Sequence, residues 1–202
     1  MKTNPCFALL ALLAAAAVAA PPATPECCVA APAPAGPISA RSIYQLDAKF
    51  CADTGQCQSL ASLRGRPVVL AMFFASCGYA CPRLVADMQA IRGRLPAELR
   101  DKAALVLVSF DPDRDTPAAL ADYRRQRALD GAWTLLHGDK GAVAELAALL
   151  GVKYRREPGG NFAHSNLITI LNPEGEIVHR REGLSGGLDE AAQAVVAAGK
   201  KS

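Results

Sequence analysis

The sequence has few aromatic residues, little charge and no long apolar run, and each scarcity excludes a class of protein. Aromatic residues make up 5% of the 202 positions, so aliphatic side chains must build most of the core. Lys and Arg never occur more than two in a row and the formal net charge is +3. The sequence therefore lacks the basic cluster that is typical of nucleic-acid-binding proteins. The longest apolar run, residues 7–20, has 14 residues, fewer than the roughly 20 that a membrane span needs. Hydrophobic residues nevertheless make up 51% of the chain, which excludes disorder throughout.

The apolar run has the layout of a secretory signal peptide. Lys2 supplies a positive start, residues 7–18 an apolar centre, and alanines the small residues that cleavage needs. We therefore expect residues 1–20 to be a signal peptide, with an N-terminal helix of the fold as the alternative. Residues 21–38, rich in Pro and Ala, predict an extended linker. Export places the mature chain in an oxidising space, expected to be a bacterial periplasm, with no membrane span after cleavage.

From residue 39 to residue 202 the pattern is that of one folded domain. Residues 43–50 and 56–60 predict an N-terminal β-hairpin around an Asp-Thr-Gly turn. Further strands are expected at residues 67–74, 103–110, 133–136, 167–171 and 176–180, and helices at residues 82–95, 117–129, 140–150 and 188–198. Strands that alternate with helices form a mainly parallel sheet covered on both faces. The predicted fold class is α/β: a thioredoxin-like fold with an N-terminal β-hairpin and an inserted strand–helix.

The main chemical signal is the segment Cys77-Gly-Tyr-Ala-Cys81-Pro82. It follows a buried strand and opens a helix, so Cys81 is expected near the helix N-cap. Free N–H groups and the positive end of the helix dipole favour thiolate there. A spacing of four places both side chains on one helical face, close enough to share a metal or a disulfide. The alternative is a structural disulfide or two buried thiols.

His164 precedes a predicted strand, in a loop that a thioredoxin-like fold packs beside the cysteine pair. Two thiolates and one imidazole form a soft three-coordinate set suited to Cu(I). Zn²⁺ with two Cys, one His and a water would use the same donors. A surface role is the alternative for His164. His137 and His179 have no comparable context and are expected at the surface or at the edge of the core.

Three blocks of the sequence resemble the SCO/SenC family over roughly residues 40–200. The first is the Cys-xxx-Cys-Pro segment, and the second is Phe-Asp-Pro-Asp-Arg-Asp-Thr-Pro at residues 110–117. The third is His164-Ser-Asn ahead of a strand closed by Asn-Pro-Glu-Gly at residues 172–175. The blocks occur in the family's order and spacing.

The resemblance implies a thioredoxin fold in which Cys77, Cys81 and His164 bind copper, so that residues 39–202 form a copper-binding domain. Cu(I) is the expected form, with Cu(II) as the alternative. The implied role is that of a copper chaperone or thiol reductase in maturing the dinuclear copper centre of cytochrome c oxidase. The implied partners are the copper-site subunit of that oxidase and other periplasmic copper carriers or thiol reductases. Copper transfer is not catalysis in the usual sense, so we expect a carrier rather than an enzyme.

The chain departs from the family's pattern in its cysteines. Gly-Tyr-Ala stands between Cys77 and Cys81, where many members carry an acidic residue. Cys51 and Cys57 form an additional pair that flanks the hairpin turn. A tight hairpin brings such positions within bridging distance, so they predict a structural disulfide, with a redox relay as the alternative. Two adjacent cysteines, residues 27 and 28, bind metal, link to another chain or do neither.

Asp111 and Arg114 follow a predicted strand on the same side of the sheet as the cysteine pair. They are candidates for groups that orient the cysteine loop or a partner. The alternative is loop and cap structure, in which Asp115 and Thr116 satisfy helix N–H groups.

Two other functions compete with copper transfer. A thiol–disulfide oxidoreductase fits the fold, although thioredoxins carry Cys-x-x-Cys and a proline before the matching strand, and residues 161–166 contain no proline. A thiol peroxidase is suggested by the segment around Cys77, but Trp133 is followed by Thr-Leu instead of the Asn-Phe of that family's partner motif.

Overall fold

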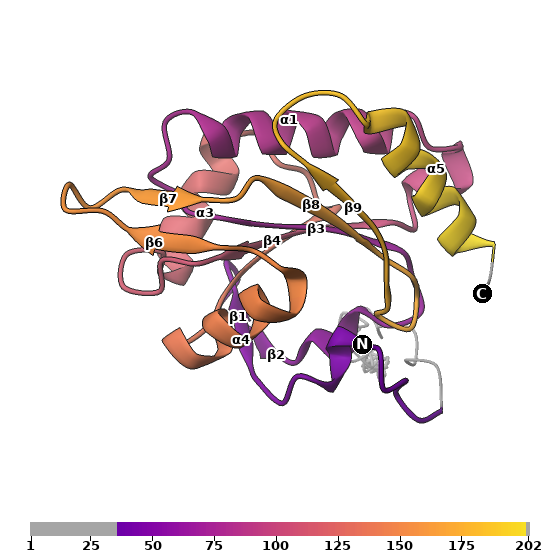
Figure 1. Cartoon of the computed structure of the whole chain (residues 1–202), viewed down its shortest axis with the longest axis horizontal. Helices are drawn as coiled ribbons and strands as arrows, with labels where there is room; N and C mark the ends of the chain where they lie inside the picture. Colours follow the sequence, from indigo (N-terminus) through magenta and orange to yellow (C-terminus); the bar gives the residue numbers. More distant parts are fainter. Residues whose placement is uncertain (1–35, 201–202) are drawn as a thin grey trace, which may run out of the picture. The chain divides into compact units, whose positions relative to one another are not determined.

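The structure of the chain is a computed structural model that describes residues 36–200 (Figure 1). The expected signal peptide, the two adjacent cysteines at residues 27 and 28, and all but the last three positions of the expected linker lie outside the described residues. No helix within residues 36–200 is long and apolar enough to cross a membrane.

Strands and helices alternate along the described chain as the sequence predicts. The strands are β1 (Phe50–Ala52), β2 (Cys57–Gln58), β3 (Val68–Phe73), β4 (Ala104–Ser109), β5 (Trp133–His137), β6 (Tyr154–Arg156), β7 (Phe162–His164), β8 (Leu167–Leu171) and β9 (Ile177–Glu182). The α-helices are α1 (Ala80–Gly93), α2 (Ala97–Arg100), α3 (Pro117–Gln126), α4 (Lys140–Leu150) and α5 (Leu188–Gly199). Two short 3-10 helices are η1 (Ile43–Gln45) and η2 (Leu60–Leu63).

Seven strands form one sheet in the order β2-β1-β5-β4-β3-β8-β9, and β6 pairs with β7 in a separate hairpin. β3, β4 and β5 run parallel, whereas β1 and β8 run antiparallel to the strands beside them. The carboxyl ends of the three parallel strands therefore meet at one edge of the sheet, where α/β proteins place their sites. This arrangement is the predicted thioredoxin-like fold with its N-terminal hairpin and inserted strand–helix.

The centre of the sheet is apolar on both faces. Every residue of β3 and β4 is buried, because α1 and α5 cover one face and α4 lies against the other (Figure 1). Continuous apolar strands are what such a doubly covered sheet requires. Helix ends follow the local sequence: Thr116 accepts a hydrogen bond from the Ala119 N–H at the start of α3, and Gly151 takes a left-handed conformation with φ 81° after α4.

Besides the short helices η2 and α2, which were not predicted, the structure differs from the sequence prediction at two places. The strand expected at residues 43–50 is mostly wrong, because the Ser42 side chain accepts from the Tyr44 N–H and starts the 3-10 helix η1. The N-terminal hairpin is correspondingly shorter. The second difference is the β6–β7 hairpin, which projects at the left of Figure 1 and was expected to be a loop. Its residues are half-buried or exposed and include arginines, so it lacks the apolar alternation of a core strand.

Candidate metal centre

The loop after β3 places the first cysteine at the N-terminus of α1. The Cys77 N–H donates to the Phe74 carbonyl at 3.2 Å, and Tyr79 is the N-cap residue, so Cys81 lies in the first turn. The Cys81 N–H donates to the Cys77 sulfur at 3.3 Å. The first N–H groups of a helix have no partner within the helix. The Cys77 sulfur therefore acts as a capping group, and Cys81 lies two residues after the N-cap, near the place that the sequence predicts.

The two thiols differ in how readily they ionise. Cys77 is 9% exposed and Cys81 is fully buried, and neither is in a disulfide. Burial acts to raise the pKa of the Cys77 thiol, but hydrogen bonds from the N–H groups of Cys81, Tyr79 and Ala80 outweigh it and lower that pKa. Burial raises the pKa of Cys81, and the neighbouring Cys77 sulfur adds to the rise. Cys77 is therefore the more nucleophilic thiol, and a metal ion that binds Cys81 displaces its proton.

His164 ends β7 and reaches the cysteines from the β6–β7 hairpin. Its Nδ1 lies 3.1 Å from the Ser165 carbonyl oxygen, which can only accept, so Nδ1 is the donor of this hydrogen bond and Nε2 is the ring nitrogen left to bind a metal. A metal-binding histidine commonly donates its other ring N–H to a backbone carbonyl in this way. The ring lies 5.8 Å from the Phe74 ring and 5.1 Å from the Phe110 ring, centroid to centroid. Two aromatic neighbours thus hold the imidazole in one orientation.

The structure brings the three predicted ligands together. One ligand atom from each of Cys77, Cys81 and His164 lies within 4.8 Å of the other two. Two sulfurs and one imidazole nitrogen are the soft donors that Cu(I) prefers, and they also suit Zn²⁺ with a fourth ligand. The donor set, the burial of the sulfurs and the hydrogen bond at Nδ1 fit a thiophilic metal ion. The same geometry permits a Cys77–Cys81 disulfide after a small movement.

Asp111 and Arg114 do not touch the cysteine loop. Asp111 is fully buried and forms ion pairs with Arg114 and, at 2.7 Å, with Arg156 of β6. Arg114 also donates to the Gly160 carbonyl in the turn of the β6–β7 hairpin at 2.7 Å. The two residues therefore anchor the hairpin that carries His164. Their link to the cysteines, which the sequence analysis expected, runs through the third ligand.

Arg156 was missed in the sequence, although a signal for its hairpin is present. Pro-Gly-Gly at residues 158–160 is a strong turn signal, and the short segments on either side pair in register. The Arg156 and Arg114 guanidinium groups lie 5.4 and 5.8 Å from the Phe162 ring centroid. Since Phe162 also packs 5.2 Å from Phe74, the arginines, the aromatic cluster and His164 form one connected structure.

Asp115 holds the start of the cysteine loop and does not cap α3, although capping was one expectation from the sequence. Its Oδ2 accepts from the Ala75 N–H at 2.9 Å and from the Ser109 hydroxyl at 2.5 Å. Ala75 is two residues before Cys77, so this buried carboxyl group fixes the start of the cysteine loop. Burial raises the pKa of Asp115, partly against these hydrogen bonds. The cap of α3 belongs to Thr116 alone.

Within residues 36–200, the other cysteines and histidines lie in the sheet. Cys51 and Cys57 form a disulfide across the β1–β2 hairpin, with Cα atoms 3.9 Å apart. His137 ends β5, is half-buried, and burial lowers its pKa. His179 is half-buried in β9. Both histidines thus lie at the edge of the core, as expected.

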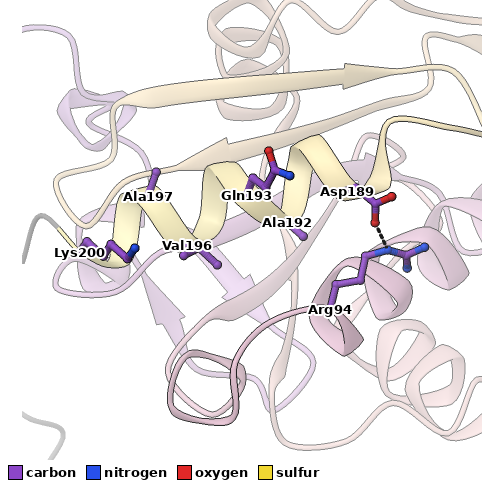
Figure 2. A pocket seen from close by; sticks show the side chains of 7 residues that line it. All are labelled: Arg94, Asp189, Ala192, Gln193, Val196, Ala197 and Lys200. Carbon is purple, nitrogen blue, oxygen red and sulfur yellow. Dashed lines mark hydrogen bonds and ion pairs between the residues drawn. The ribbon is translucent and has the colours of Figure 1, made fainter.

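One hollow lies away from these groups, along the outer face of α5 (Figure 2). Its volume is about 570 Å³, and an ion pair of 2.6 Å between Arg94 and Asp189 closes one end. The rest is lined by Ala192, Gln193, Val196, Ala197 and Lys200. The hollow has no thiol or imidazole among its lining residues, so the soft donors of the candidate metal centre lie at the sheet edge instead.

Fold and site together define a thioredoxin-like protein with an open dithiol–imidazole site. The family model described as SCO1/SenC matches residues 40–198, and the chain belongs to that family. A protein of Stutzerimonas stutzeri with the provisional name of copper-binding protein is 31% identical over 123 residues. That match spans 59% of this chain and 59% of the relative.

Solved structures share the fold. A crystal structure from Aquifex aeolicus superposes with a TM-score of 0.70 at 21% identity, and the match covers 79% of this chain and 94% of that one. ScoI from Arabidopsis thaliana, solved with copper bound, gives a TM-score of 0.63 at 22% identity, with 76% of this chain and 96% of that chain covered.

Proposed function

We propose that this chain is an exported Cu(I) carrier that delivers copper to the dinuclear copper centre of cytochrome c oxidase in the periplasm. The observation that carries the proposal is the set of two sulfurs and one imidazole nitrogen within 4.8 Å of one another. Copper bound to the structurally similar ScoI and the copper-binding name of the Stutzerimonas relative support the choice of metal. The recipient in the proposal is the copper-site subunit of the oxidase, with other periplasmic copper carriers or thiol reductases acting before it.

The site suits transfer because its three ligands differ in exposure. His164 is half-buried and Cys77 is 9% exposed, whereas Cys81 is fully buried. A recipient can therefore displace the outer ligands in turn while Cys81 still holds the ion. Ligand exchange of this kind needs no change in the oxidation state of copper.

An anaerobic titration with Cu(I) against a chromogenic chelator tests the proposal, on the chain with Cys77 and Cys81 as free thiols and the Cys51–Cys57 disulfide intact. We expect one tightly held equivalent that disappears in the variant Cys77→Ser with Cys81→Ser. His179→Ala is the matched control, since it removes a histidine outside the site and should leave the affinity unchanged. The loaded chain should then pass its copper to the isolated copper-site domain of the oxidase subunit. Copper retained by the double-serine variant at unchanged affinity excludes the proposed ligands.

A thiol–disulfide oxidoreductase is the second candidate, and one observation favours it. The lowered pKa of the Cys77 thiol beside the raised pKa of the buried Cys81 thiol is the asymmetry of an attacking and a resolving cysteine. Its natural substrate would be the cysteine pair of a copper-site protein. Reduction of such a disulfide that survives His164→Ala favours this function, because thiol exchange needs no imidazole ligand.

A further inference from the structure

A second set of two cysteines and one histidine lies in the sheet. In the antiparallel pair β1–β2, Cys51 is directly opposite Cys57, and in the antiparallel pair β1–β5 it is directly opposite His137. Directly opposed residues of antiparallel strands place their side chains on the same face, with Cβ atoms about 4.5–5.5 Å apart. All three side chains therefore share one face of three adjacent strands, with Cys51 in the middle.

The histidine of this set has an unused donor atom. His137 Nε2 is buried and has no hydrogen-bond partner among the residues that the structure describes. A buried polar atom without a partner costs about 1–3 kcal/mol, so it calls for an explanation. A metal ion that binds at this nitrogen in another redox state of the chain supplies one.

We propose that the Cys51–Cys57 disulfide masks a second Cu(I) site, made of the two cysteine thiolates and the His137 imidazole and opened by reduction. We call it the hairpin site and the Cys77–Cys81–His164 set the loop site. The donors are the same two sulfurs and one nitrogen, a soft set that suits Cu(I). The hairpin site shares no residue with the loop site, so the proposal of a hairpin site does not depend on copper delivery by the loop site.

The opening step is thiol–disulfide exchange. Cys57 is exposed, so a thiolate of an exported dithiol reductase can attack the bond. The S–S bond between Cys51 and Cys57 breaks and takes up two electrons and two protons, while the reductase dithiol becomes a disulfide. Cu(I) then binds and displaces the two thiol protons. The number of copper ions that the chain carries thus depends on the thiol redox state of its compartment.

The hairpin keeps its place without the disulfide because several other contacts hold it. Asp53, next to β1, forms an ion pair with Arg124 of α3, and Arg124 also donates to the Trp133 carbonyl at 3.0 Å. The Asp53 N–H donates to the Leu135 carbonyl at 3.1 Å. Phe50 of β1 is fully buried in the core. Reduction therefore frees the two sulfurs without releasing β1 from β5.

The test uses the full chain with Cys77→Ser and Cys81→Ser, which removes the loop site. Cu(I) is titrated anaerobically against a chromogenic chelator, before and after reduction with a phosphine that is then removed. We expect no bound copper in the oxidised variant and one equivalent in the reduced variant. Adding His137→Ala should lower the Cu(I) affinity of the reduced variant by at least 10- to 100-fold. Losing even the hydrogen-bond partner of a metal ligand lowers metal affinity by that factor.

Two controls keep the outcome decisive. Adding Cys51→Ser and Cys57→Ser to the same variant should abolish the copper that reduction introduces. If the reduced variant still binds copper after these changes, other cysteines such as Cys27 and Cys28 bind it, and the proposal is overturned. A circular dichroism spectrum of the reduced variant that matches the oxidised one establishes that the fold is intact. A reduced, folded variant that takes up no copper also overturns the proposal.

Discussion

The loop site and the hairpin site each contain two cysteines and one histidine. The cysteines are free thiols in the loop site and form a disulfide in the hairpin site. In the loop site, three backbone N–H groups at the start of α1 point at the Cys77 sulfur and lower its pKa. In the hairpin site, the N–H groups around Cys51 belong to the ladder of β1, β2 and β5, so no helix start stabilises a thiolate there. A stabilised thiolate keeps a dithiol reduced and available. The surroundings of a cysteine pair, more than its spacing, thus decide whether it is open or bridged.

The largest expected effect comes from removing the buried ion pairs that anchor the hairpin of the loop site. Asp111→Ala leaves the guanidinium groups of Arg114 and Arg156 without their shared buried carboxylate. We expect the chain to lose about 3 kcal/mol of unfolding free energy, the low end of the range for a broken buried ion pair, because both guanidinium groups are partly exposed and water solvates them. Urea unfolding measures the loss. Asp113→Ala removes an exposed carboxylate two positions away, and an equal loss in that control would contradict the anchoring role.

The next largest effect is expected when the histidine ligand of the loop site is removed and both cysteines are kept. His164→Ala should weaken Cu(I) binding at the loop site by about 100-fold or more, because removing a ligand costs at least as much as removing its hydrogen-bond partner. Competition with a chromogenic chelator gives the affinity. The thiol count after denaturation should stay unchanged, which shows that both cysteines remain reduced. An affinity within threefold of the unchanged chain would refute the ligand assignment.

A smaller effect is expected when the hairpin site is removed. Cys51→Ser with Cys57→Ser releases a loop closed by a sequence separation of 6, so the loss of unfolding free energy is about 2 kcal/mol on the chain-entropy model. The first Cu(I) equivalent should keep its affinity, because the loop site shares no ligand with the hairpin. Unfolding and copper titrations of the same sample measure both. Loss of that equivalent would mean that the two sites are coupled.

The smallest effect concerns the pH dependence of the loop thiols. The lowered pKa of Cys77 means that its alkylation by iodoacetamide should reach half its maximal rate below the pH of about 8.5 that is usual for a free cysteine. Cys81 should react only at higher pH, because burial raises its pKa. Cys81→Ser should keep the fast reaction and Cys77→Ser should lose it. A fast reaction that persists in Cys77→Ser would reverse the two assignments.

Much of the fold was predictable from local sequence. The strand at Leu167–Leu171 and the helix at Lys140–Leu150 have their predicted bounds, because continuous apolar runs and a helix-ending Gly151 are local signals. Cys77 and Cys81 were likewise placed correctly at a strand-to-helix junction. Asp115 was not, because its partner Ala75 lies 40 positions earlier. A hydrogen bond over that separation depends on where β3 and β4 end beside each other.

The sequence by itself therefore determined most of the strands and helices, and which thiols stand at the start of a helix. The sequence predicts His164 as the partner of Cys77 and Cys81, but only the tertiary structure showed how it reaches them and that His137 lies opposite Cys51. His164 reaches Cys77 through a hairpin that buried Asp111 anchors, and His137 reaches Cys51 through the register of β1 on β5. Periodicity and capping act over a few residues, whereas strand register and buried ion pairs join segments far apart in the chain. Signals that act over a few residues can be recognised in the sequence, whereas contacts between distant segments depend on the tertiary structure.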